Sequence, residues 1–158
     1  MADASNEVVV EMQIQRIKQF SFTINEGLFK PDATFNVTID TKHALDVEKN
    51  FIDLTLRITF KYPDTEQFCI QSEISNIFFI KDLKKYIIEG EEDLAIPSNA
   101  LITIMSLSIS HSRALIFSSV GGSIYNGTIL PLVNPEEVAR QHFGGKVVPH
   151  KALLKKGK

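Results

Sequence analysis

Four histidines are the side chains of this sequence whose chemistry best suits catalysis or metal binding: His43, His111, His142 and His150. An imidazole acts as a general base or acid near neutral pH and is a common metal ligand. None of the four stands at metal-ligand spacing from another, and the single cysteine, Cys69, excludes both a cysteine-only metal site and an intramolecular disulfide. We therefore expect no metal ion and no cofactor, with Cys69 buried as a core thiol.

The remaining candidates for catalysis are also weak. His111 and Ser112 are adjacent, and neighbouring residues of a helix point apart, so they do not form a nucleophile and base pair. The Gly121-Gly122-Ser123 run follows an expected helix rather than a strand, unlike a nucleophile elbow or a phosphate loop. The acids Glu89, Glu91, Glu92 and Asp93 form a charged run typical of solvated loops. The sequence therefore argues against an enzyme.

The length and the charge distribution of the chain further limit the class of protein to which it can belong. A chain of 158 residues predicts one domain, here residues 7–145, after a disordered N-terminus 1–6 and before a flexible basic tail 146–158. The tail holds five lysines and no acid, which leaves 12 basic against 19 acidic residues elsewhere, a net charge of −7. An acidic body argues against nucleic acid binding. Neither a signal peptide nor a membrane span is recognisable, which predicts a cytoplasmic protein.

The apolar stretch from Pro97 to Val120 is the element around which the chain is organised. Only Arg113 is formally charged in it, Ser98 or Asn99 suits a helix start, and Gly121-Gly122 suits a helix end. Period-two alternation from Leu107 to Ser112 favours a strand instead. Because the stretch is long and has residues suited to capping both ends, we expect a long helix, buried on more than one side.

Alternating apolar residues predict four strands before this helix. They are Glu7–Ile24 with a bend near Lys18, Phe35–Asp40, Ile52–Lys61, and a fourth strand from Phe68 that changes phase at a bulge near Ser75-Asn76. A polar connection, 41–50, joins the second strand to the third. Pro135, capped by Asn134, begins a short second helix. The fold class is α+β, a four-stranded antiparallel sheet with both helices packed on one face.

Two loops carry large apolar side chains. Leu28 and Phe29 lie in the loop after the first strand, and Ile124, Tyr125, Ile129 and Leu132 lie in the loop after the long helix. Such residues either close the edge of the core or line a groove, and for Leu28 and Phe29 the sequence leaves both possibilities open.

Several stretches together resemble the SecB family of bacterial export chaperones. They are Gln13-Ile14-Gln15-Arg16-Ile17 with Phe20-Ser21-Phe22, Leu56-Arg57-Ile58-Thr59, Phe68-Cys69-Ile70, Ile77-Phe78-Phe79-Ile80, Ser112-Arg113-Ala114-Leu115-Ile116, and the loop from Gly122 that ends in Leu130-Pro131-Leu132-Val133-Asn134-Pro135. The similarity covers residues 7–143. Each motif is weak alone, but their common order and spacing make the match fairly specific.

The resemblance implies a crossover after the first strand and a homotetramer, a dimer of dimers with long helices between two sheets. It also implies an ATP-independent holdase that keeps unfolded preproteins export-competent in apolar grooves. The client-binding residues would be Leu28, Phe29, Phe78, Phe79, Ile124, Tyr125, Ile129 and Leu132. The helix face that meets another subunit would comprise Met105, Ile109, Ser112, Arg113 and Ile116. A lone buried charge needs a partner, so we expect Arg113 to meet a carboxylate or a helix-end carbonyl across that interface.

The chain also departs from the family. Members that dock on the motor SecA carry acids on the exposed sheet face, where this chain has Gln19, Thr23 and Gln71, with Glu73 close by. A partnership with SecA is therefore doubtful. Two alternatives stay open: a SecB-like chaperone dedicated to one client, such as an antitoxin, and a non-chaperone module that binds one ligand or one folded partner.

Overall fold

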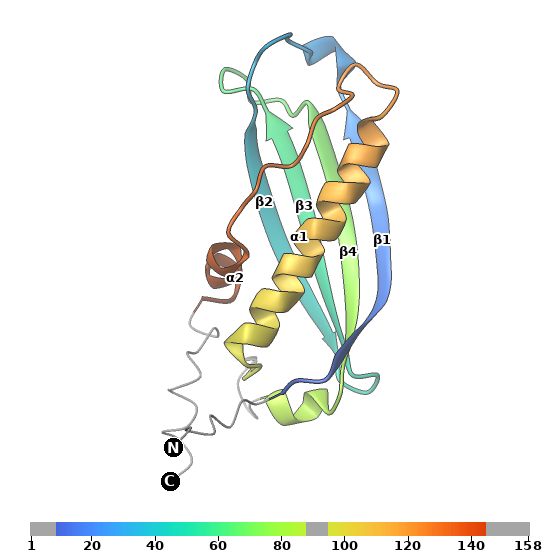
Figure 1. The fold of residues 1–158 in the computed structure, drawn as a ribbon, viewed down its shortest axis with the longest axis vertical. Coiled ribbons are helices and arrows are strands. Elements are labelled where there is room, and N and C mark those ends of the chain that lie inside the picture. The colour runs from blue at the N-terminus through green and yellow to red at the C-terminus, as the bar shows by residue number, and fades with distance from the viewer. Residues whose placement is uncertain (1–8, 88–94, 145–158) are drawn as a thin grey trace, which may run out of the picture.

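Four antiparallel strands form an open sheet in the order β1-β4-β3-β2, and two helices lie on one of its faces (Figure 1). The structure is a computed structural model that describes residues 9–87 and 95–144. The expected N-terminus 1–6, the tail 146–158 and the acids Glu89–Asp93 lie outside the described residues. The elements are β1 (Met12–Ile24), η1 (Glu26–Leu28), β2 (Asn36–Asp46), β3 (Phe51–Lys61), β4 (Ile70–Ile80), η2 (Leu83–Tyr86), α1 (Ser98–Val120) and α2 (Pro135–Phe143). This arrangement confirms the predicted fold class and the crossover after the first strand.

The core lies between the sheet and α1. Its centre is the inner face of β3, where every second side chain is buried: Ile52, Leu54, Leu56, Ile58 and Phe60. The alternation in the sequence predicted this face, because side chains of a strand point to opposite sides in turn. Cys69 is buried in the same core, as expected.

Helix α1 crosses the inner face of the sheet diagonally (Figure 1). It begins at Ser98 and ends at Val120, and the left-handed backbone that terminates it lies at Gly122, with a φ of 80°. Length and composition alone would let this helix cross a membrane, with a mean hydropathy of 1.4. Its apolar character is accounted for by packing, since nine of its residues are buried in the fold.

Strand β1 has two irregularities, whereas the sequence predicted one bend near Lys18. Two register shifts against β4, between Ile14 and Arg16 and between Gln19 and Ser21, flank Lys18. Each shift exchanges the faces of the strand. The inner face therefore carries Ile17 and Gln19 between the even-numbered residues at either end.

Strand β2 runs to Asp46, so the predicted polar connection 41–50 is wrong over most of its length. Thr41, His43 and Leu45 pair with Leu56, Leu54 and Ile52 of β3 in unbroken register. Pairing with a neighbouring strand overrides the weak polar pattern of this segment. The turn is short, and Asn50 adopts its left-handed conformation, with a φ of 59°.

The predicted bulge in β4 is also wrong. Its register with β3 is continuous through Ser75 and Asn76, so Asn76 faces the core and Ile77 faces outward. Asn76 is fully buried and accepts a hydrogen bond from His111 at 2.8 Å. Ser72, also buried, is bonded to Gln19 and to the carbonyl of Ser21. Because these polar groups are satisfied, the strand keeps polar residues on its inner face without changing phase.

Helix α2 forms where the sequence predicts it. The Asn134 side chain accepts a hydrogen bond from the backbone N–H of Glu136 at 3.0 Å, and Pro135 occupies the first turn. Ala139 and Phe143 are the residues that it buries against the rest of the fold.

Candidate functional site

The segment 121–134, which runs from the end of α1 to the start of α2, carries three large apolar side chains that are exposed. Ile124 is 48% exposed, Ile129 is 56% exposed and Leu132 is 90% exposed. Fully burying an exposed side chain of this size stabilises a protein by roughly 1.5–3 kcal/mol, of which Leu132 forgoes nearly all and the two half-exposed isoleucines forgo a part. Three exposed large apolar side chains on one segment make it a candidate for a surface that binds another molecule.

Arg113 of α1 fixes the backbone of this segment. Its Nε donates to the carbonyl of Leu130 at 3.0 Å, and its Nη2 donates to the carbonyl of Pro131 at 3.2 Å. The Leu130 side chain is buried, whereas Ile129 and Leu132 on either side of the held carbonyls face outward. Arg113 thus finds hydrogen-bond partners in a loop of its own chain, so its charge does not require a partner across an interface.

The loop after β1 meets this segment at one end of the molecule, at the top of Figure 1. The Tyr125 hydroxyl donates to the carbonyl of Asn25 at 2.5 Å, and the rings of Phe29 and Tyr125 pack edge to face with centroids 5.6 Å apart. Burial raises the pKa of Tyr125 well above its usual range, so its hydroxyl stays a donor at any physiological pH. The tyrosine thus joins the two loops.

A cluster of aromatic rings packs next to the two loops. Phe35 stacks on Tyr62 with centroids 4.8 Å apart and packs edge to face on Phe60 at 5.6 Å. The Tyr62 hydroxyl accepts from the backbone N–H of Lys30 at 2.9 Å, which holds the first loop in place. Aromatic pairs contribute about 0.5–1.5 kcal/mol beyond their buried area.

The eight residues suggested for client binding do not all reach this surface. Ile124, Ile129 and Leu132 are exposed, Leu28 and Phe29 are half-buried, and Tyr125 is buried at their centre. Phe78 is fully buried in the core. Phe79 lies on the outer face of the sheet against Phe51, with ring centroids 6.5 Å apart. The last two are therefore not part of the same surface.

The residues suggested for a subunit interface on α1 mostly face inward. Met105, Ile109, Ser112 and Ile116 are buried against their own chain, and only Arg113 is partly accessible. The solvent-facing stripe of α1 instead carries Thr103, Ser110, Ala114, Phe117 and Ser118. An interface on this helix would have to use that stripe.

A further apolar surface on edge strand β1 was not recognised in the sequence. Ile14, Ile17 and Phe20 are exposed large side chains, as is Phe117 of α1. In the sequence, this surface is indicated by the break in the apolar alternation after Ile14, which reflects the two register shifts of β1.

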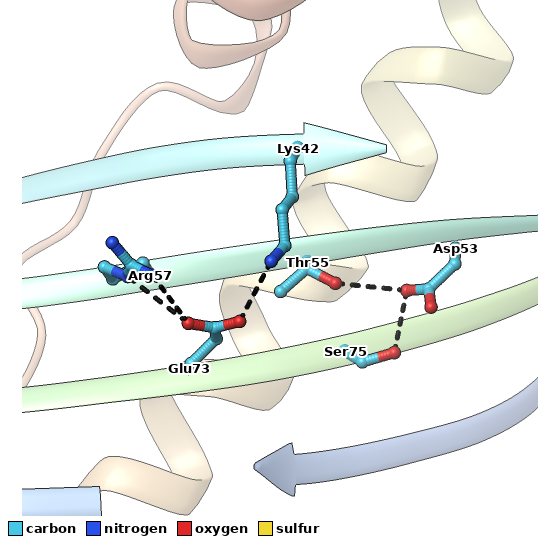
Figure 2. A network of polar contacts seen from close by, with 6 residues as sticks. All are labelled: Lys42, Asp53, Thr55, Arg57, Glu73 and Ser75. Carbon is cyan, nitrogen blue, oxygen red and sulfur yellow. Dashed lines mark hydrogen bonds and ion pairs between the residues drawn. The ribbon is translucent and has the colours of Figure 1, made fainter. Parts of the chain in front are cut away.

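The outer face of the sheet carries a polar network (Figure 2). Glu73 of β4 accepts from Lys42 at 3.1 Å and from Arg57 Nη2 at 3.1 Å, while Asp53 accepts from Ser75 at 2.7 Å and from Thr55 at 3.2 Å. The hydrogen bonds from Lys42 and then Arg57 hold the pKa of Glu73 below its usual value. The carboxylate of Glu73 is thereby balanced by two cations.

Comparisons with known proteins support the fold. No family model and no curated protein matches the sequence. Among solved structures, the SecB-like chaperone Rv1957 of Mycobacterium tuberculosis, in complex with a ChAD peptide from the antitoxin HigA1 (Rv1956), superposes with a TM-score of 0.54 at 16% identity, over 77% of this chain and 90% of that one. A protein of unknown function from Streptococcus agalactiae superposes with a TM-score of 0.43 at 13% identity, over 78% of this chain and 99% of that one. The chain has a SecB-like fold.

Proposed function

We propose that the protein is an ATP-independent chaperone that holds non-native polypeptides on the apolar surface of segment 121–134. The observation that carries the proposal is the exposure of Ile124, Ile129 and Leu132 on a backbone held by Arg113. Apolar burial is non-directional and stabilises by about 25 cal/mol per Å², so such a surface accepts many sequences. The acidic body and the cytoplasmic location that we propose are compatible with that role.

The proposal extends to the kind of client that the protein holds. Unfolded preproteins on the way to export are the clients that the SecB resemblance implies. A single dedicated client, such as an antitoxin, is the alternative, and it is favoured by the similarity in fold to Rv1957, whose structure contains a peptide from an antitoxin. Material captured from a cell lysate separates the two: many unfolded precursors support the first, and one species supports the second.

We further propose a homotetramer that works without SecA. The exposed stripe of α1 and the apolar edge strand β1 offer two surfaces for contacts between subunits, as a dimer of dimers requires. Glu73, the acid nearest to the positions that dock SecA in the family, is balanced by Lys42 and Arg57. Solution mass by light scattering and a SecA binding assay test these two points separately.

The holdase proposal is tested by aggregation of a chemically denatured protein, followed by light scattering. We expect suppression at stoichiometric chaperone, and less suppression by Leu132→Ser. Val9→Ser is the matched control, because Val9 is 83% exposed against 90% for Leu132 and does not belong to segment 121–134. No suppression by the wild type, or equal suppression by both variants, contradicts the proposal. Binding of one small apolar ligand without suppression would favour a non-chaperone module instead.

A further inference from the structure

Two histidines that lie far apart in the sequence meet where α2 packs on edge strand β2. His43 Nδ1 and His142 Nε2 are 2.8 Å apart, their rings are nearly perpendicular at 87°, and the ring centroids are 5.0 Å apart. From the spacing of the four histidines in the sequence, no such pair was expected. The extension of β2 beyond Asp40 and the docking of α2 together bring this pair into contact.

Packing holds both rings in position. The ring of Phe143, which is buried, lies with its centroid 5.3 Å from that of His43 and 4.5 Å from that of His142. His43 belongs to the inner face of β2, in register with Leu54 of β3. Side chains whose rotamers are fixed by packing lose little freedom when they bind a ligand.

The spacing of the two nitrogens is close to that of two ligands of one metal ion. Imidazole nitrogens suit Zn²⁺, Ni²⁺ and Cu²⁺. Two nitrogens bonded to tetrahedral Zn²⁺ at about 2.0–2.1 Å lie about 3.3 Å from each other. The nitrogens would need to separate by about 0.5 Å, and each ring would need to turn so that its lone pair points at the ion instead of at the other nitrogen. A neutral histidine keeps its one proton on the nitrogen that does not bind the metal.

Water would complete the coordination. His142 borders a cavity of about 280 Å³ whose other walls include Asp40, Thr41 and Gln141. This volume is ample for ordered water molecules. Over the described ranges, no group of three histidine, cysteine or acidic side chains stands at metal-binding distance. The described residues therefore supply two ligands, which makes the site weaker than a closed structural zinc site.

We propose that His43 and His142 bind one divalent transition-metal ion, Zn²⁺ or Ni²⁺, which joins α2 to β2. The two ligands come from segments 99 residues apart, so the ion cross-links the last helix to the edge of the sheet. An ion that binds only the folded state stabilises it by mass action. This inference is independent of the proposed chaperone function.

The test is isothermal titration of untagged full-length protein with ZnCl₂ and with NiCl₂. We expect His43→Gln and His142→Gln each to weaken binding by about tenfold or more, because even the loss of a group behind a ligand costs that much. The double variant should lose little more than either single one, since both ligands serve one ion. The melting temperature of the wild type, but not of the variants, should rise with Zn²⁺.

Two controls address the other histidines, and one measurement avoids substitutions. His111→Gln, on α1, and His150→Gln, outside the described residues, should bind Zn²⁺ as the wild type does. In the wild type, the ¹⁵N resonances of His43 Nδ1 and His142 Nε2 should shift together on addition of Zn²⁺, which does not depend on how well a variant folds. If millimolar Zn²⁺ moves neither resonance, or if His150→Gln alone abolishes binding, the proposal is overturned and the pair is only a hydrogen bond.

Discussion

Arg113 Nε donates a hydrogen bond to the carbonyl of Leu130 at 3.0 Å, from the middle of an otherwise uncharged helix to the loop that bears the exposed apolar residues. The guanidinium also holds the carbonyl of Pro131 at 3.2 Å. Its planar arrangement of donors lets one side chain hold two successive carbonyls. Arg113 thus positions the backbone of the segment that we propose binds clients.

Replacing Arg113 by Lys should loosen that surface without unfolding the protein. A lysine keeps the charge but not the paired geometry, so we expect a loss of about 1–3 kcal/mol in the free energy of unfolding. Amide hydrogen exchange within segment 121–134 should become faster, and suppression of aggregation should weaken. Arg140→Lys is the control, because Arg140 is paired with Glu136 on the exposed side of α2. Unchanged exchange in the segment would show that Arg113 does not position it.

Phe29→Ser separates a groove residue from a core residue, the two possibilities that the sequence left open. The ring is half-buried, and it packs edge to face on Tyr125 at the margin of the core. We expect client binding to fall while the free energy of unfolding drops by less than the roughly 2–5 kcal/mol typical of a large-to-small change in the core. Urea unfolding beside Ile74→Ala, a fully buried site, supplies the comparison. An equal loss of stability in both variants would place Phe29 in the core.

The sequence predicted those parts of the fold whose signals are local. The alternation of β3, the caps of α2 and the length of α1 each depend on neighbouring residues, and the structure has all three elements. The faces of β1 and β4 were misjudged because they depend on distant partners. Asn76 faces the core, where His111 on α1 donates a hydrogen bond to it, and that pairing is not visible in a strand pattern.

The candidate site was predictable only where apolar residues lie on loops. Ile124, Ile129 and Leu132 lie in the segment that joins the two helices, and the structure exposes them. Phe78 shares their residue type, but its neighbours in the sheet bury it. The meeting of His43 with His142 needed the whole topology, because it joins the extended part of β2 to the last helix.

Stability should fall in acid partly through Glu73. Its pKa lies below the usual value near 4.5 because Lys42 and then Arg57 donate hydrogen bonds to its carboxylate. The folded state therefore favours the ionised form, and the resulting stabilisation is present above that value and is lost as the pH falls through the folded pKa. Because Lys42 and Arg57 are largely exposed, we expect Glu73→Gln to cost under about 1 kcal/mol at pH 7 and to flatten the loss between pH 5 and 3. Urea midpoints across that range measure it, with Glu137→Gln as the control; parallel curves for Glu73→Gln and wild type would contradict it.

His111 should make the fold less stable as the pH falls below neutrality. Burial lowers the pKa of His111 below its usual value of 6.5, because its charged form is poorly solvated beside Asn76. The unfolded chain therefore takes up a proton first, and the stability is lost as the pH drops from 6.5 through the folded pKa. An NMR titration of the ring protons should give a value below 6.5, and His111→Gln should remove part of the difference in unfolding free energy between pH 7 and pH 5. A ring that titrates at or above 6.5 would refute this.

Ser108→Ala should stabilise the protein. Within the part of the chain that the structure describes, Ser108 Oγ is the buried side-chain polar atom that lacks a hydrogen-bond partner, on a face of α1 that packs against the sheet. Removing an unsatisfied hydroxyl recovers part of its desolvation cost, which is about 1–3 kcal/mol, and alanine also favours a helix more than serine does. The matched control is Ser112→Ala, because Ser112 is equally buried but donates to the carbonyl of Ser108 at 2.8 Å. We expect a higher urea midpoint for Ser108→Ala than for Ser112→Ala; the reverse order would mean that the Ser108 hydroxyl is satisfied in solution.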